Sequence, residues 1–185
     1  MACAERLRQI LGEPLEYLHP QRLELPPGFD NPGVRCALNR ILLEGSDPSA
    51  PWPCNGVAQQ WIRQWRQLPY IARLMGAWRL FPQLARGGAL QRLPASLLQF
   101  AGCRPAPRAC LPLERSCAPL QLVDAAGYHV LVGLSGFVSS PLLERLRLQF
   151  AADVIDRQAQ WPLAAADTTL FFLAVQHARH YPNPQ

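Results

Sequence analysis

The sequence predicts an all-α protein that folds as a single irregular helical domain over residues 1–185. Two observations lead to this prediction: many prolines stand where a helix would begin, and apolar residues recur three and four positions apart. Proline at the first helical position costs no hydrogen bond and presets the backbone dihedral. Apolar residues at that spacing line one face of a helix. A chain of 185 residues is also long enough to bury a core.

Five proline pairs mark expected helix starts, beginning with Asn31-Pro32 and ending with Trp161-Pro162. The helices expected after these pairs cover residues 34–44, 70–82, 95–101, 142–160 and 163–181. Ser140 is expected to cap the fourth of them, with Glu144 in its first turn, because both residue types favour a helix N-terminus.

Apolar spacing gives each expected helix one buried face. Over residues 142–160 it places Leu143, Leu146, Phe150 and Val154 inward, and it leaves Arg145, Arg147 and Arg157 outside. The other faces expected to be buried are Trp61, Ile62, Trp65 and Leu68, and Ile71, Leu74, Met75 and Trp78. In the last helix Leu170, Leu173, Ala174 and His177 are expected to share one face.

Residues 128–138 fit either a strand or a helix, since they combine β-branched residues with glycines. A buried helix is favoured, because the sequence offers no convincing partner strands. Residues 46–55 and 102–119 are rich in proline and are expected to be loops.

The net charge is +5, and all 18 basic residues are arginine. A GC-rich coding sequence explains this preference without a function and is the favoured interpretation. The functional interpretation is a protein partner, because the guanidinium fork suits carboxylates at protein interfaces. The expected binding residues are Trp52, which lies in a proline-rich loop, and the arginines Arg63, Arg66, Arg73 and Arg79. Nucleic-acid binding through the arginines is an alternative, but they are scattered rather than gathered in a dense basic block.

The six cysteines predict neither a metal site nor a disulfide framework. None belongs to a Cys-x-x-Cys pair, and prolines interrupt the segment that holds Cys103, Cys110 and Cys117. Unpaired thiols are typical of a reducing cytosol. Residues 1–11 carry charges and lack the apolar core of a signal peptide, so a cytoplasmic protein is expected. No cofactor is expected either.

One motif suggests catalysis. The segment 133–137 (Gly-Leu-Ser-Gly-Phe) departs from the Gly-x-Ser-x-Gly nucleophile elbow at Phe137. A serine hydrolase built on Ser135, with Asp153 or Asp167 and His177, is therefore an alternative, and a buried helical Ser135 is favoured over it. His177 and His180 are expected to lie at a helix C-terminus, where the helix dipole stabilises positive charge. No catalytic residue is expected.

Several segments resemble one family. Tyr17-Leu18-His19, followed by Leu25-Pro26, resembles the opening of the SctK family, which includes YscK, PscK, OrgA and MxiK. Residues 68–76 (LPYIARLMG) look like its central helical region, and residues 127–138 with 144–148 are similar to its C-terminal part. By these segments the Ysc-class members, PscK among them, are expected to be the most similar.

The resemblance implies a non-enzymatic adaptor of the type III secretion sorting platform. Such proteins lie in the cytosolic pods below the inner-membrane ring, where they connect the cytoplasmic domain of SctD to SctQ, and indirectly to SctL and the ATPase SctN. The family supplies no catalytic residues and no interface motif that can be transferred to residues of this sequence.

Overall fold

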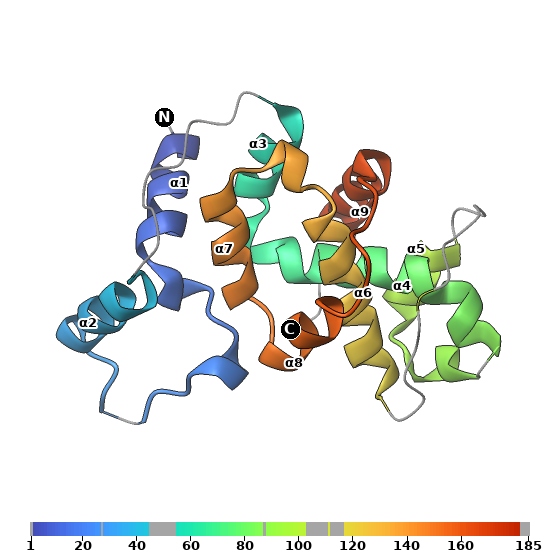
Figure 1. Cartoon of the computed structure of the whole chain (residues 1–185), viewed down its shortest axis with the longest axis horizontal. Coiled ribbons are helices and arrows are strands. Elements are labelled where there is room, and N and C mark those ends of the chain that lie inside the picture. Colours follow the sequence, from blue (N-terminus) through green and yellow to red (C-terminus); the bar gives the residue numbers. More distant parts are fainter. Residues whose placement is uncertain are drawn as a thin grey trace. The chain divides into compact units, whose positions relative to one another are not determined.

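The computed structural model describes residues 2–26, 28–44, 55–86, 88–102, 111 and 117–181. All regular structure in these residues is helical, which confirms the predicted all-α class (Figure 1). The α-helices are α1 (Ala2–Gly12), α2 (Pro32–Leu42), α3 (Gly56–Arg63), α4 (Leu68–Arg86), α5 (Ala95–Gly102), α6 (Pro119–Val132), α7 (Ser140–Leu148), α8 (Ala152–Gln158) and α9 (Thr168–His180). Short 3-10 turns join several of them: η1 (Pro14–Glu16), η2 (Pro20–Arg22), η3 (Trp65–Gln67), η4 (Ala89–Arg92) and η5 (Ser135–Phe137).

Helix starts follow the predicted chemistry in the first half of the chain. The Asn31 side chain accepts a hydrogen bond from the Val34 amide at 3.0 Å, so α2 begins at Pro32 as expected. α4 differs from the prediction, because it continues through Pro82 to Arg86. Leu80 and Leu84 on either side of this proline are buried, and their packing offsets the hydrogen bond that Pro82 cannot make.

The helix predicted over residues 142–160 is broken into α7 and α8. The carbonyl of Leu148 accepts from the His19 amide at 2.8 Å, and the carbonyl of Phe150 accepts from Arg22 Nε at 2.6 Å. These carbonyls therefore accept hydrogen bonds from the N-terminal segment instead of from amides of the next helical turn. The cap is also corrected: Ser139, not Ser140, precedes the helix, without a side-chain capping bond.

The last helix begins later than predicted. Residues 162–167 are not helical, and α9 starts at Thr168 because the Asp167 side chain accepts from the Leu170 amide at 2.8 Å. The Pro162 carbonyl is bonded by the His129 ring at 2.6 Å rather than by a helical amide. The ambiguous residues 128–138 are helical to Val132 and continue into the turn η5, so the helix prediction is confirmed for their first part.

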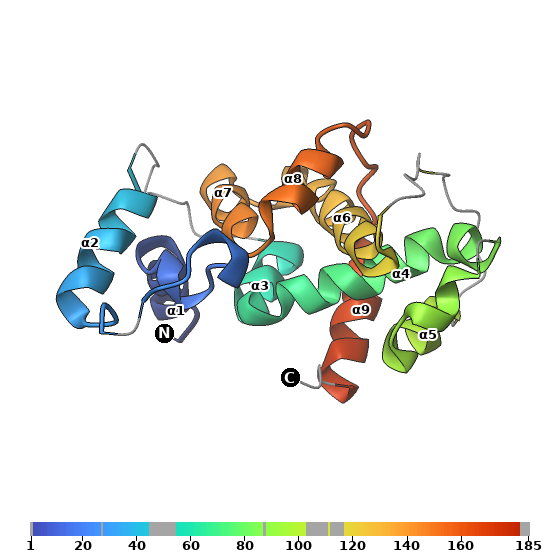
Figure 2. The same ribbon diagram turned by 90° about the horizontal axis from the view of Figure 1, so that it is seen from below.

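The chain forms two compact units, residues 1–66 with 135–152 and residues 67–134 with 153–185. In the first unit, α1 packs against α3 and α7 through Leu7, Ile10 and Leu11, all buried. Figures 1 and 2 both place α2 beside α1, on the side away from α7. The expectation of a single domain stays a prediction.

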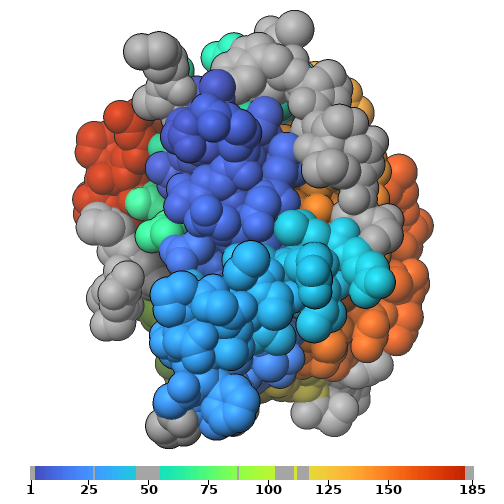
Figure 3. Space-filling view, turned by 90° about the vertical axis from the view of Figure 1, so that its left-hand side faces the viewer, coloured from blue at the N-terminus to red at the C-terminus, as the bar shows by residue number. Residues whose placement is uncertain are grey.

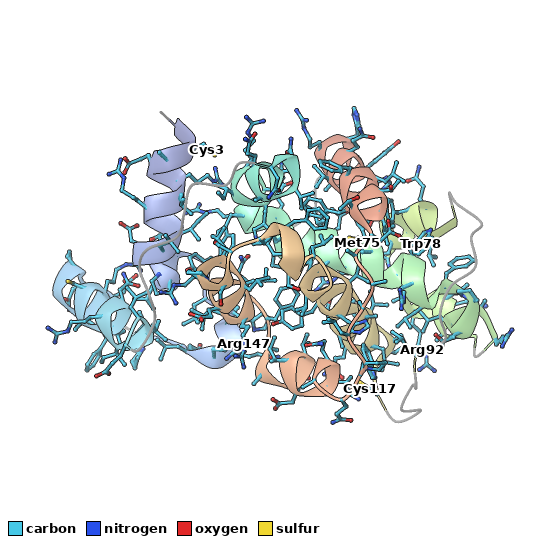
Figure 4. All side chains as sticks on the ribbon, turned by 45° about the horizontal axis from the view of Figure 1, so that its top comes forward. Cys3, Met75, Trp78, Arg92, Cys117 and Arg147 are labelled. Carbon is cyan, nitrogen blue, oxygen red and sulfur yellow. The ribbon has the colours of Figure 1, made fainter. Side chains whose placement is uncertain are left out.

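The second unit is organised around α4, which packs against α5, α6 and α9. α4 and α6 cross where both carry glycine: a Cβ on Gly76 would lie 1.9 Å from the Val123 carbonyl oxygen, and one on Gly127 equally close to that of Ala72. Figure 4 labels Met75 and Trp78 on α4, and both side chains are buried. The predicted faces of Trp61, Ile62, Trp65 and Leu68, and of Ile71, Leu74, Met75 and Trp78, are therefore confirmed as core.

Candidate protein-binding surfaces

The first candidate surface lies on the first unit, around α2. No residue of α2 is buried, although the helix carries Val34, Leu38 and Leu42. A groove of about 1100 Å³ separates α2 from the end of α1 and from Glu16. Figure 3 shows α1 and α2, in blue tones, on the face turned to the viewer. Ile41 of α2 is 60% exposed, and Phe29 just before the helix is 58% exposed.

Glu16 holds this region together by accepting from two arginines. Arg35 of α2 donates to it at 2.7 Å and Arg66 of η3 at 2.9 Å. Arg35 also donates to Asp30 at 2.9 Å. The hydrogen bond that Arg35 donates to Asp30 is the largest cause of its raised pKa, and the contact with Glu16 raises it further. Polar contacts rather than burial thus attach α2, and its apolar side chains remain accessible.

The second candidate surface is a groove on the second unit. It has a volume of about 560 Å³ and is lined mainly by Trp78 of α4, Phe100 of α5 and Leu170, Leu173, His177 and His180 of α9. Leu170 and Trp78 form its buried floor, whereas Leu173 is 38% exposed. An apolar groove between helices is a common form of peptide-binding site.

His177 is the central polar residue of this groove. Its ring lies between Phe100 and Tyr181, with centroid separations of 5.1 and 4.7 Å. Burial lowers the pKa of His177, and a hydrogen bond that its ring donates to the Ser96 backbone carbonyl opposes that shift. The Nε2 atom is buried and has no hydrogen-bond partner among the described residues.

Two of the predicted binding arginines lie at the surface of the first unit. Arg63 at the end of α3 and Arg66 in η3 are both exposed, as expected. The guanidinium of Arg66 is engaged by Glu16, so it reaches a partner only as part of that ion pair.

The other two arginines are half-buried, which corrects the expectation that they are exposed. Arg73 of α4 donates through Nε and Nη2 to the two carboxylate oxygens of Asp124 on α6, at 2.7 and 3.0 Å. This bidentate pair raises the pKa of Arg73. Arg79 is also half-buried, and its Nε has no partner among the described residues. The sequence places Arg73 opposite an apolar face, but it does not reveal the acid on α6 that meets it.

Trp52 lies outside the described residues. The other four tryptophans, Trp61, Trp65, Trp78 and Trp161, are all buried, as expected of helix-face aromatics. Trp65 meets Tyr17 edge-on at 5.1 Å, and the Tyr17 hydroxyl donates to the Ile10 carbonyl at 2.6 Å. Burial raises the pKa of Tyr17 well above its usual value.

Ser135 does not have the surroundings that a nucleophile elbow requires. An elbow places serine after a strand, whereas Ser135 lies in the turn η5 that follows α6. It is also exposed, so the expectation of a buried helical serine is wrong. His177 and His180 lie in the last turn of α9, as expected.

The described cysteines are Cys3, Cys36 and Cys117, and none of them is in a disulfide. Figure 4 labels Cys3 near the start of α1 and Cys117 just before α6. Cys117 Sγ donates to Gln121 Oε1 at 3.3 Å. Within the described ranges no three His, Cys, Asp or Glu side chains gather in a way that could hold a metal ion. Cys54, Cys103 and Cys110 lie outside those ranges.

Two buried polar side chains, which sequence reasoning did not single out as internal, bond backbone carbonyls. Arg145 of α7 is 2% exposed, which corrects the prediction that it lies outside, and its Nε donates to the Leu11 carbonyl at 3.4 Å. A cation there meets the negative end of the α1 dipole.

His129 of α6 donates from Nε2 to the Pro162 carbonyl and lies edge-on to Trp161. Burial lowers the pKa of His129, and the positive charge of Arg79 lowers it further.

Fold and surfaces define a helical protein whose described residues offer grooves suited to other polypeptides. Residues 7–180 match the family described as "Bacterial type III secretion apparatus protein (OrgA_MxiK)". The oxygen-regulated invasion protein OrgA of Salmonella typhimurium is 32% identical over 195 residues in strains 14028s, SL1344 and LT2; the alignment covers 95% of this chain and 88% of the relative. No solved structure matches this chain.

The chain therefore belongs to the OrgA/MxiK family of type III secretion apparatus proteins. This confirms the family to which the sequence segments point, while the expectation of greatest similarity to the Ysc-class members stays a prediction. None of the helices in the described ranges has the length and apolar content needed to cross a bilayer.

Proposed function

We propose that this protein is a non-enzymatic adaptor of the type III secretion sorting platform that links the cytoplasmic domain of SctD to SctQ, and through SctQ to SctL and the ATPase SctN. The observation that supports this most strongly is the family match over residues 7–180. In this proposal the protein works in the cytoplasm, at the inner face of the inner membrane, and meets the membrane only through its partners.

The two grooves support a linking role, because a linker needs at least two separate contact surfaces. The α2 groove is mixed in charge, with Glu13, Glu16 and Glu44 among its lining residues beside Arg35 and Arg40. The α9 groove is mainly apolar, and its titratable lining residues are His177, His180 and Tyr181. Surfaces so different in chemistry suit different partners.

A bridging experiment tests the proposal. The SctD cytoplasmic domain is immobilised, and purified SctQ is passed over it with and without this protein. SctQ should be retained only when the protein is present, and each partner should bind the protein alone. Retention of SctQ without the protein, or failure of either partner to bind it, contradicts the proposed link.

A further inference from the structure

The groove between α4, α5 and α9 has a feature that core packing does not explain: α9 is apolar on two sides. Leu170, Phe171 and Ala174 face inward and are buried. Phe172 and Leu173 are 37% and 38% exposed. A turn of 100° per residue brings Thr169, Leu173, Gln176 and His180 onto one line, so an accessible ridge that is apolar at its centre borders the groove.

The groove itself is lined by uncharged residues and by His177, His180 and Tyr181, but the helices around it carry basic side chains and no acidic ones. The segments that form α4, α5 and α9 contain Arg73, Arg79, Arg86 and Arg179, together with His177 and His180, and no Asp or Glu. Between Asp47 and Glu114 the sequence has eight arginines and no acidic residue. Arg73 is neutralised by Asp124, whereas Arg179 is exposed beside the groove in the last turn of α9. The basic side chains that a segment in this groove can meet are therefore His180, which lines it, and Arg179.

His177 adds a polar contact within the apolar lining. Its buried Nε2 has no hydrogen-bond partner in the described residues, and buried polar atoms are normally satisfied. The aromatic rings of Phe100 and Tyr181 both pack against the imidazole.

We infer that the groove between α4, α5 and α9 is the docking site for an amphipathic helix of a partner protein, which inserts an apolar ridge beside Leu173 and carries Asp and Glu on its flanks. An apolar helix ridge in an apolar groove supplies binding energy through three or four anchor side chains spaced by one helical turn. The acidic flanks meet Arg179 and His180. The inference rests on the proposed adaptor function, since it names the chemistry of one partner contact.

Two exposed leucines of the same unit provide a matched pair of variants. Leu173→Glu places a negative charge on the ridge of the groove. Leu163→Glu places the same charge on a side chain that is 73% exposed and lies outside the groove. Both sites have room for a glutamate at the surface, so circular dichroism should show unchanged helix content for both variants.

The probes are two synthetic amphipathic helical peptides with the same leucine ridge, one flanked by Glu and the other by Lys. The Glu peptide should bind the wild-type protein and Leu163→Glu equally, and Leu173→Glu at least about tenfold more weakly. The Lys peptide should bind the wild-type protein at least about tenfold more weakly than the Glu peptide. Amide shifts in α4, α5 and α9, followed by NMR, should locate the bound Glu peptide.

Any one of three peptide results overturns the inference. These are no binding of the Glu peptide, equal binding of both peptides, and equal binding of the Glu peptide by the two variants. A concentration-dependent dimer in sedimentation equilibrium that Leu173→Glu abolishes also overturns it, because the occupant would then be a second copy of this chain.

Purified SctD domain and SctQ separate this inference from the proposed function. If the peptide results hold and neither protein binds, the link between SctD and SctQ fails while the docking site stands. If both proteins bind Leu173→Glu as well as the wild type and the Glu peptide does not bind, the docking site fails while the adaptor function stands.

Discussion

At the scale of single residues, Gly76 of α4 lies directly against the backbone of α6. A Cβ at this position would come within 1.9 Å of the Val123 carbonyl oxygen and 2.6 Å of the Gly127 amide nitrogen. These are backbone atoms, which cannot rotate away as the end of a flexible side chain can. The approach of α4 to α6 therefore depends on the absence of a side chain at residue 76.

Gly76→Ala should destabilise the protein by about 1–3 kcal/mol, the usual cost of overpacking a core. The measurement is the urea midpoint of unfolding, followed by circular dichroism. Gly56→Ala is the control, because a Cβ there meets nothing within 4 Å. An unchanged midpoint for Gly76→Ala would show that the two helices do not cross at these glycines.

His129 makes stability depend on pH. Its folded-state pKa lies below the ordinary value of about 6.5, so the native state binds fewer protons than the unfolded state between those two pKa values. The stability contribution is fully present above about pH 6.5 and is lost as the pH falls through the lowered pKa. His177 has a lowered pKa too and contributes with the same sign.

His129→Gln should therefore lose less stability than the wild type when the pH is lowered from 7 to 5. Glutamine keeps an N–H donor for the Pro162 carbonyl but cannot take up the proton. The free energy of unfolding is measured by urea titration at several pH values. Parallel pH profiles for the two proteins would exclude His129 as a source of the dependence.

At the scale of elements, α9 begins at the Asp167 cap and carries most of the groove. Asp167→Ala removes the acceptor for the Leu170 amide and should cost about 1 kcal/mol of stability. Asp167→Asn keeps an acceptor at the same place and should restore most of the loss. Urea unfolding of the three proteins measures both effects, and equal stability of the alanine and asparagine variants would contradict this cap.

The ion pair between Arg73 and Asp124 joins α4 to α6. Asp124→Asn should destabilise the protein by about 1.5–3 kcal/mol, because a half-buried guanidinium loses its charged acceptor. Glu5→Gln is a useful comparison, since Glu5 and its partner Arg8 are both exposed and surface pairs contribute little. If the two variants lose equal stability in thermal unfolding, the partial burial of the Arg73–Asp124 pair does not increase its contribution to stability.

Local chemistry made several elements predictable, and distant contacts limited the rest. Asn31-Pro32 and the apolar spacing around Trp61 locate α2 and the core face of α3, because caps and periodicity act within a few residues. The break after Leu148 depends on His19 and Arg22, which are more than a hundred positions away in the chain. The sequence predicts only part of the groove between α4, α5 and α9. Helical spacing groups Leu170, Leu173 and His177 on one face, but Phe100 and Tyr181 join them only in the folded chain.

At the scale of the whole molecule, the chain passes from the first unit to the second, back again, and once more to the second. The first unit is therefore built from two segments, and its α7 supplies the buried Leu142, Arg145 and Leu146. The intervening residues 67–134 belong to the second unit. While that unit is folded, it holds the ends of this insertion; when it unfolds, the insertion becomes a long flexible loop within the first unit.

Closing such a loop costs roughly 4 kcal/mol of conformational entropy, so unfolding the second unit should greatly weaken the first. Gly76→Ala, which acts in the second unit, should thus speed hydrogen exchange in α1, α3 and α7 as well as in α4 and α6. Exchange is followed by mass spectrometry of peptides from each unit, with Gly56→Ala as the control. Faster exchange in α4 and α6 alone would mean that the units unfold independently, against the single domain expected from the sequence.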